Sequence, residues 1–258
     1  MDALDRLQEA TSGAAFPRDR FTAWTRTVDG DQAWRFRVRG GPAALQAWRT
    51  FFELHPRTGL YPVILGDLSD YTLDMLTWRA DALAGTGLPQ DEELPDVVEL
   101  FVRWMGDVTA DSYLRDIPKQ IEKFDADRIK GFLSKRPDEA AVRALTGDAV
   151  HMALVPTEEG AKVPALLAWS GAEGAGHTGP DHLVVLRHWN GTHGANLVAM
   201  NGESLEFLVD RPADDGPGAF ELAVQHHAYC HDLVELDAPN LAAVAAVCLG
   251  RHWYFTWR

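Results

Sequence analysis

Residues 252–258 read HWYFTWR, and this density of aromatic side chains limits the folds open to the chain. In a strand, Trp253, Phe255 and Trp257 point to one face, while Tyr254 and Thr256 point to the other. Both faces favour burial, and an exposed aromatic edge strand is an aggregation hazard. We therefore expect this strand to lie centrally in a sheet, with residues 180–258 forming one cooperative unit around it.

The rest of the second half alternates short strand and helix patterns. Two buried or half-buried strands are followed by a glycine-rich loop and a helix, then by two more strands, two helices and the aromatic strand. The predicted spans are strands at 150–156, 164–169, 195–200 and 204–209, and helices at 181–189 and 218–234. This order predicts an α+β fold with a mixed or antiparallel sheet and packed helices.

The first half predicts a second α/β unit. Trp34, Phe36 and Val38 alternate with three arginines, which indicates a half-exposed strand. A helix begins at Pro42, and the apolar run 60–65 indicates a buried strand. Residues 88–96 are acidic and rich in proline, and residues 111–138 are highly charged with one apolar helical stripe. We place the join near residue 140, giving an N-terminal α/β region at 1–140 and a C-terminal α+β domain at 141–258.

The net charge of −14 narrows the range of partners that the protein can bind. An excess of carboxylates repels phosphate backbones and anionic lipid headgroups, so neither nucleic acid nor a membrane is expected as a partner. A basic protein or a small-molecule ligand fits better. The acidic first residues do not resemble a signal peptide, and the apolar run 241–249 is too short to span a bilayer. Two cysteines without a disulfide framework favour the cytoplasm.

The predicted helix 218–234 carries the candidates for chemistry. His226 and Cys230 are four residues apart on one stripe, so they are placed as the base and nucleophile of a thiol enzyme. The alternative is that both fill the core, as buried cysteines usually do. His227 and His231 share a neighbouring stripe and are weak candidates for a metal, but no third ligand is apparent. No metal or cofactor is therefore expected.

Two further patterns suggest ligands. Gly174, Gly176 and Gly179 have the spacing of a dinucleotide-binding loop, with Glu203 as the acid that would bind ribose. A mobile loop is the competing interpretation. Asp67 follows a strand and is close in sequence to two more aspartates, which suits a divalent cation or a solvated acidic turn.

Three stretches, HLVVLRHWNGTHGANLVAMNGESLEFLVDRP, ELAVQHHAYCHDLV and LAAVAAVCLGRHWYFTWR, resemble the DUF4253 family of bacterial, actinobacterial-type proteins, whose function is unassigned. The resemblance covers about the last 110 residues well and the region from Tyr61 to Asp67 weakly. Its motif Ala-x5-Tyr-Cys-x-Asp is matched at Ala223, Tyr229, Cys230 and Asp232. The three nearby histidines depart from the family pattern. The resemblance makes the following residues candidates for binding: Tyr61, Asp67, Trp189, Tyr229, Asp232 and Trp253.

The function predicted from the sequence is a non-catalytic binding or interaction protein of the cytoplasm that recognises a basic protein. An immunity protein that masks a basic toxin is one form of it. The alternative is a thiol-dependent enzyme using Cys230 with a nearby histidine. An exposed Cys230 beside a histidine would favour the enzyme, and a packed Cys230 with an acidic surface would favour the binding protein.

Overall fold

The computed structural model describes the chain except for residues 1–2, 12–15, 109–141 and 234–239. The described strands form one sheet in the order β1-β2-β4-β3-β5-β6-β7. All neighbours pair antiparallel except β3 and β5, which are parallel, so the sheet is mixed and the predicted α+β class is confirmed. The strands are β1 Thr22–Arg26, β2 Gln32–Arg39, β3 Leu60–Gly66, β4 Ala149–Pro156, β5 Ala195–Met200, β6 Ser204–Val209 and β7 His252–Thr256.

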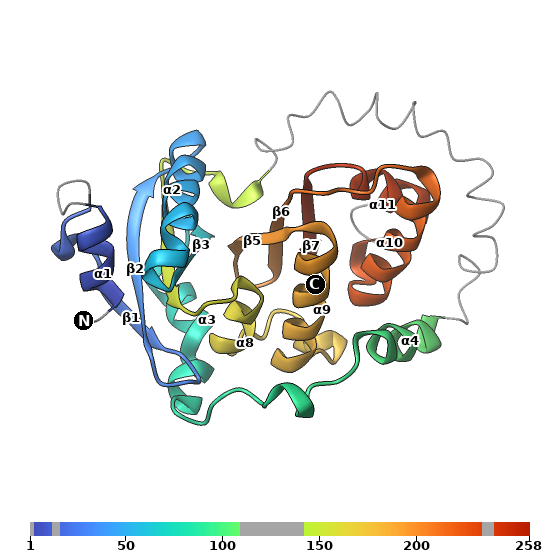
Figure 1. The fold of residues 1–258 in the computed structure, drawn as a ribbon, viewed down its shortest axis with the longest axis horizontal. Coiled ribbons are helices and arrows are strands. Elements are labelled where there is room, and N and C mark those ends of the chain that lie inside the picture. The colour runs from blue at the N-terminus through green and yellow to red at the C-terminus, as the bar shows by residue number, and fades with distance from the viewer. Residues whose placement is uncertain (1–2, 12–15, 109–141, 234–239) are drawn as a thin grey trace.

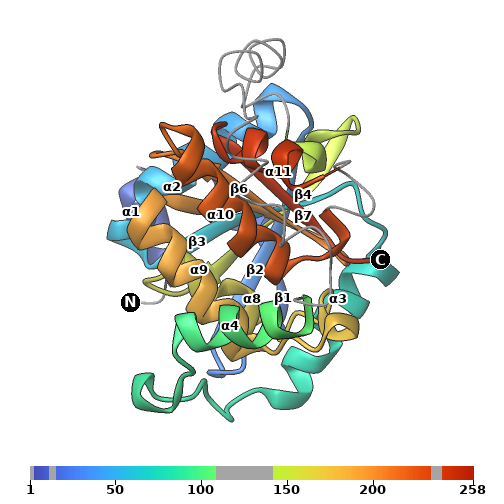
Figure 2. The ribbon, with the colours of Figure 1, turned by 90° about the vertical axis from the view of Figure 1, so that its right-hand side faces the viewer.

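Helices cover both faces of the sheet (Figures 1 and 2). One core lies between the sheet and α1 and α2, and the larger core lies between the sheet and the other helices. The α-helices are α1 Ala3–Ala10, α2 Pro42–Thr58, α3 Asp70–Leu83, α4 Val97–Val108, α8 Val163–Leu166, α9 Gly179–His193, α10 Gly216–Tyr229 and α11 Leu241–Cys248. Short 3-10 turns are η1 Arg18–Arg20, η2 Asp91–Glu93, η4 Arg143–Leu145, η5 Gly160–Lys162 and η6 Glu173–Ala175.

Local sequence signals set most of these boundaries. Helix α2 begins with Pro42 at its first position and ends at Thr58, before Gly59, whose φ of 69° is left-handed. In α9, the Thr178 side chain accepts from the Asp181 backbone, and the Asp181 side chain accepts in return from the Thr178 backbone. The strands predicted at 150–156, 195–200 and 204–209 correspond to β4, β5 and β6.

The strand predicted at 164–169 is wrong. These residues form the end of helix α8 and the turn after it, in which Ala168 has a φ of 47°. Pro164 lies in the first turn of α8, where its missing N–H costs nothing. All four residues of α8 are buried. A short apolar run of this kind has no polar face to reveal its period, so its sequence does not distinguish a buried strand from a buried helix.

The central placement predicted for the aromatic strand is also wrong. Strand β7 pairs with β6 and ends the described sheet. It is nevertheless buried, because Trp253 and Phe255 point into the larger core and are fully covered by α9 and α10. On the opposite face, the Arg143 guanidinium lies 3.7 Å from the centre of the Tyr254 ring. The aromatic side chains of β7 are therefore buried by groups packed on the two faces of the strand, and not by a neighbouring strand on each side.

The two halves of the chain share the sheet. Strand β4, from the second half, lies between β2 and β3, which come from the first half (Figure 1). Arg39 is paired with Ala149 on one side of β4, and Leu60 is paired with Pro156 on the other. The boundary near residue 140 and the helical stripe at 111–138 fall on residues outside the described ranges. The boundary stays a prediction, and the strands on either side of it are packed as one body.

A buried carboxylate fixes the segment that leads into β4. Glu206 on β6 is 1% exposed and accepts hydrogen bonds from the backbone N–H groups of Arg143 and Ala144, at 2.7 and 2.9 Å. Its side chain also lies 2.8 Å from the His252 ring nitrogen Nε2 on β7. Three partners compensate the cost of burying this carboxylate.

Among the described helices, none is long and apolar enough to cross a membrane.

Candidate functional site

Acidic side chains gather around two adjoining hollows at the end of the sheet where β2 begins and β4 ends. One hollow, of about 450 Å³, is lined by Asp29, Asp91 and Glu92, and the other, of about 590 Å³, by Asp29, Asp31 and Glu158. Lys162 lines both, and Arg6 lines the second. We call these five carboxylates, Asp29, Asp31, Asp91, Glu92 and Glu158, the acidic face. It is concave and exposed, with acids in excess of bases.

The acidic face is held in place by the backbone of residues 85–88. The N–H groups of Gly85 and Gly87 both donate to the Val28 carbonyl, at 2.8 and 2.9 Å. The Asp29 side chain accepts from the Leu88 N–H at 3.1 Å. These bonds attach the acidic, proline-rich segment to the turn between β1 and β2. Carboxylates from distant parts of the sequence are thereby brought to one surface.

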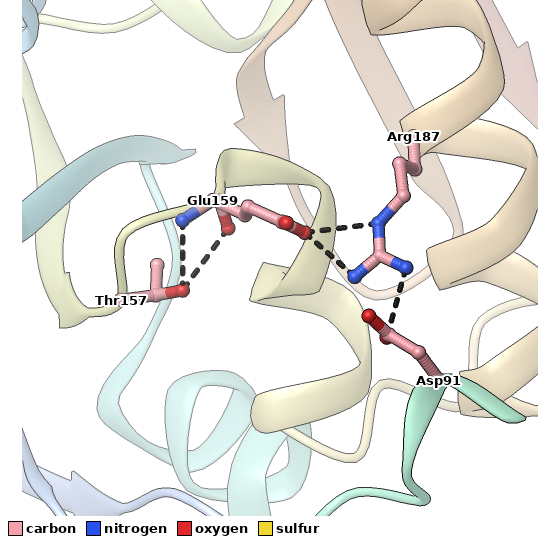
Figure 3. A network of polar contacts seen from close by, with 4 residues as sticks. All are labelled: Asp91, Thr157, Glu159 and Arg187. Atoms are coloured by element: carbon pink, nitrogen blue, oxygen red, sulfur yellow. Dashed lines mark hydrogen bonds and ion pairs between the residues drawn. The ribbon is translucent and has the colours of Figure 1, made fainter.

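Arg187 on α9 provides a second attachment (Figure 3). Its guanidinium donates to Glu159 at 2.9 and 3.1 Å and to Asp91 at 3.1 Å. Glu159 follows β4, and its N–H donates to the Thr157 hydroxyl. The planar guanidinium has donors in fixed directions and can bond two carboxylates at once. A lysine ammonium holds two carboxylates with less defined geometry. Burial lowers the pKa of Arg187, but Glu159 and Asp91 raise it by more. The pKa is therefore above its ordinary value, and the guanidinium stays charged.

A third hollow has the opposite charge. It measures about 600 Å³ and lies where β3 ends and β4 begins, at the other end of these strands from the acidic face. Arg20, Arg35 and Arg37 line it together with Asp67 and His151. We call it the arginine hollow. It contains Asp67, which the sequence suggested as a binding residue, but the neighbours of Asp67 are cationic and do not form a cation site.

Tyr61, another binding candidate, is buried and lines a smaller hollow of about 360 Å³. Its hydroxyl donates to the Leu197 carbonyl at 2.9 Å, linking β3 to β5. Burial raises the pKa of the Tyr61 phenol far above its ordinary value, although the Leu197 bond opposes this. Tyr61 therefore stays protonated and acts as a structural donor between strands.

The predicted pair of His226 and Cys230 does not form. Helix α10 ends at Tyr229, so Cys230 has an extended backbone and leaves the helical stripe. Its thiol points to the Thr256 carbonyl at 3.1 Å, while His226 Nδ1 lies 3.5 Å from Cys248 Sγ. Burial raises the pKa of Cys230 to about 12 and lowers the pKa of His226 to about 3. Both are neutral at pH 7 and 1% exposed or less.

We expect Cys230 to react slowly with a thiol reagent at pH 7. With its pKa at about 12 instead of 9.0, the reactive thiolate is about a thousandfold scarcer than in a free thiol, and burial blocks access as well. The measurement is the rate of labelling by an aromatic disulfide in a Cys248→Ala variant, native and in denaturant. Fast labelling of the native variant, with a pH midpoint below 8, would reinstate the thiol enzyme.

Three more binding candidates are parts of the core. Trp189, Tyr229 and Trp253 are each 0% exposed. The Trp189 ring N–H donates to Gln225 at 2.9 Å, and the Tyr229 hydroxyl lies 2.6 Å from His182 Nδ1. None of the three can contact a partner unless the core opens. Their shared role is to join α9, α10 and β7.

The remaining candidates near the end of α10 have structural contacts too. Asp232 accepts from the Arg258 N–H at 2.7 Å, which fixes the chain after β7. The rings of His227 and His231 lie edge to face with centres 5.1 Å apart. Within the described ranges, no group of three or more histidine, cysteine, aspartate or glutamate side chains is placed to hold a metal ion.

The glycine-rich loop does not have the geometry of a dinucleotide site. A dinucleotide fingerprint follows a strand directly, whereas the segment from Gly174 to Gly179 comes after helix α8, and Gly174 lies within the turn η6. Gly176 has a φ of 79°, and Gly179 opens α9 in close contact with Ala165. The glycines therefore connect two helices that pack closely.

The described residues define an α+β protein built on one mixed sheet, with an acidic face at one end and an arginine hollow at the other. Within that class, residues 151–258 match the family model DUF4253, a domain of unknown function. The chain therefore contains a DUF4253 domain. No curated protein and no solved structure was found to match it.

Proposed function

We propose that this protein is a non-catalytic binding protein of the cytoplasm that recognises a basic protein through its acidic face. The observation that carries this proposal is the convergence of five carboxylates around two connected hollows on a rigidly attached surface. Charged concave surfaces concentrate partners of opposite charge and speed their encounter. An immunity protein that masks a basic toxin is one concrete form of this function.

The state of the thiols also supports a binding role. Cys230 and Cys248 are both free and buried, and burial raises the pKa of each thiol. Thiol catalysis needs an accessible thiolate next to a base, and Cys230 offers neither access nor low pKa. Free thiols are also typical of proteins kept in a reducing compartment, which supports the cytoplasm.

The test is a charge reversal of the acidic face in the full-length chain. Asp31, Glu92 and Glu158 are exposed, and among the described residues their carboxylates make no hydrogen bond or ion pair. We expect Asp31→Lys/Glu92→Lys/Glu158→Lys to abolish capture of basic proteins from a lysate of the source cells. With one captured protein purified, the wild-type association rate should fall at least tenfold between 50 and 500 mM salt, because screening shortens the range of attraction.

A matched control separates the surface from the net charge. Glu203, Asp214 and Glu221 are also exposed but line none of the hollows. Their triple change to lysine alters the net charge equally and should leave capture at the wild-type level. Equal loss in both triple variants, or capture of acidic proteins only, would refute recognition by the acidic face.

A further inference from the structure

The arginine hollow carries cations against the overall charge of the chain. Acidic residues outnumber basic ones by 38 to 24, yet the hollow brings three arginines together with one aspartate. Positive charges that line one hollow raise its electrostatic potential, so the arrangement favours the binding of an anion. The hollow shares no lining residue with the acidic face.

The sheet itself brings these side chains together. Arg35 and Arg37 are two apart on β2, so both point to the same face. Arg37 is paired with His151 of β4, and His151 is paired on its other side with Gly66, where β3 ends. Arg20 enters from η1, and its guanidinium donates to the Arg37 carbonyl at 3.4 Å. Strand register therefore sets the positions of Arg35, Arg37 and His151, while Arg20 comes from the turn η1.

The ion pair that Arg37 makes with Asp67 is weak. The Arg37 guanidinium lies 3.8 Å from the Asp67 carboxylate, and both side chains are more than half exposed. A pair this long and this solvated is loosely held. Arg37 can therefore turn its remaining donors to a ligand without losing a strong internal contact.

The start of helix α3, next to the hollow, also suits an anion. Leu68 and Ser69 line it, and the 14-residue helix α3 begins directly after them. The Ser69 hydroxyl accepts from the Thr72 N–H, which fixes the helix start. The start of a helix carries a partial positive charge that favours anions. The arginines and the start of α3 thus border the same hollow.

We propose that the arginine hollow binds a small soluble phosphate ester. The planar guanidinium matches the oxygens of phosphate in a two-point contact, so arginines from two elements can hold one phosphate group from two directions. The volume of about 600 Å³ lies within the range of small-molecule sites. The chain charge of −14 repels anionic membranes, which selects the soluble ester over a lipid headgroup.

The test uses inorganic pyrophosphate and glycerol phosphate as probes of the full-length chain, with calorimetric titration at low salt. We expect binding of both, and a rise in Tm with probe concentration. Arg37→Gln and Arg20→Gln should each weaken binding at least tenfold. Arg39→Gln is the matched control, because Arg39 lies on the same strand and the same face but outside the hollow. It should change the affinity less than twofold.

Several outcomes would overturn the proposal. One is no binding of either probe at millimolar concentration by the wild type. Another is an equal loss of affinity in Arg37→Gln and Arg39→Gln, which would indicate general attraction to charge. Citrate binding as tightly as pyrophosphate would show carboxylate recognition, and binding only to vesicles that contain phosphatidic acid would show a membrane site. The acidic-face triple variant should bind the probes as the wild type does, so the two proposals can fail separately.

Discussion

A chain that stops at Gly250 is expected not to fold. The truncation removes β7 and with it Trp253 and Phe255, both fully buried. Each large aromatic lost from a core costs about 3–5 kcal/mol, and the pairing of β7 with β6 is lost as well. Domains of this kind are stable by only about 5–15 kcal/mol. We expect aggregated protein on expression, and loss of the cooperative thermal transition in any soluble fraction.

Point variants on β7 make this prediction quantitative. Phe255 stacks on Trp189 with ring centres 5.3 Å apart, whereas Tyr254 on the other face is half-buried next to Arg143. Phe255→Ala should lower the free energy of unfolding by about 3–5 kcal/mol in urea denaturation, and Tyr254→Ala by about 1 kcal/mol. Equal effects of the two variants, or a folded truncation product, would show that the burial of β7 does not determine stability.

Neither residues 1–140 nor residues 141–258 are expected to fold alone. Strand β4 lies between β2 and β3, so a cut near residue 140 removes the central partner of both. The first fragment would expose the facing edges of β2 and β3, and the second would leave β4 without either neighbour. Each fragment expressed alone should be insoluble or lack a cooperative unfolding transition.

Co-expression of the two fragments is the control. If the sheet forms from both, a tagged first fragment should copurify with the second in equal amounts, and the complex should unfold in one transition. The segment that matches DUF4253 begins at residue 151, inside β4. A 141–258 fragment that unfolds cooperatively by itself would show instead that the family segment is an independent domain.

The sequence predicted those elements whose signals are local. Alternation on β2, the proline at the start of α2 and the glycine after α9 each depend on a few adjacent residues. The order of the central strands depends on pairing between β2 and β4, β3 and β4, and β3 and β5, whose partners are far apart in the sequence, and no local pattern encodes it. The edge position of β7 was missed for the same reason, because cover from α9 and α10 arises only in the tertiary structure.

For the candidate sites, too, the sequence showed the local features but not the contacts between distant segments. The acidic composition of residues 88–96 was visible in the sequence, but their attachment to Asp29 and Arg187 was not. The arginine hollow was missed, although Arg35 and Arg37 were noted as an exposed face. His151 joins them through strand pairing, and Arg20 joins them from the turn η1, where it bonds the Arg37 carbonyl. The helical placement of Cys230 failed because α10 ends one residue earlier.

The late position of β4 in the chain has a consequence for synthesis. Ribosomes add about 5–20 residues per second, so β2 and β3 leave the exit tunnel roughly 5 to 20 seconds before the strand that joins them. During that interval their edges are open to pairing with other chains. Arg35, Arg37 and Arg39 charge the edge of β2 that will receive β4, and charged side chains are a common defence of open edges. We therefore expect the arginine alternation to limit pairing of β2 with other chains while β4 is still being synthesised.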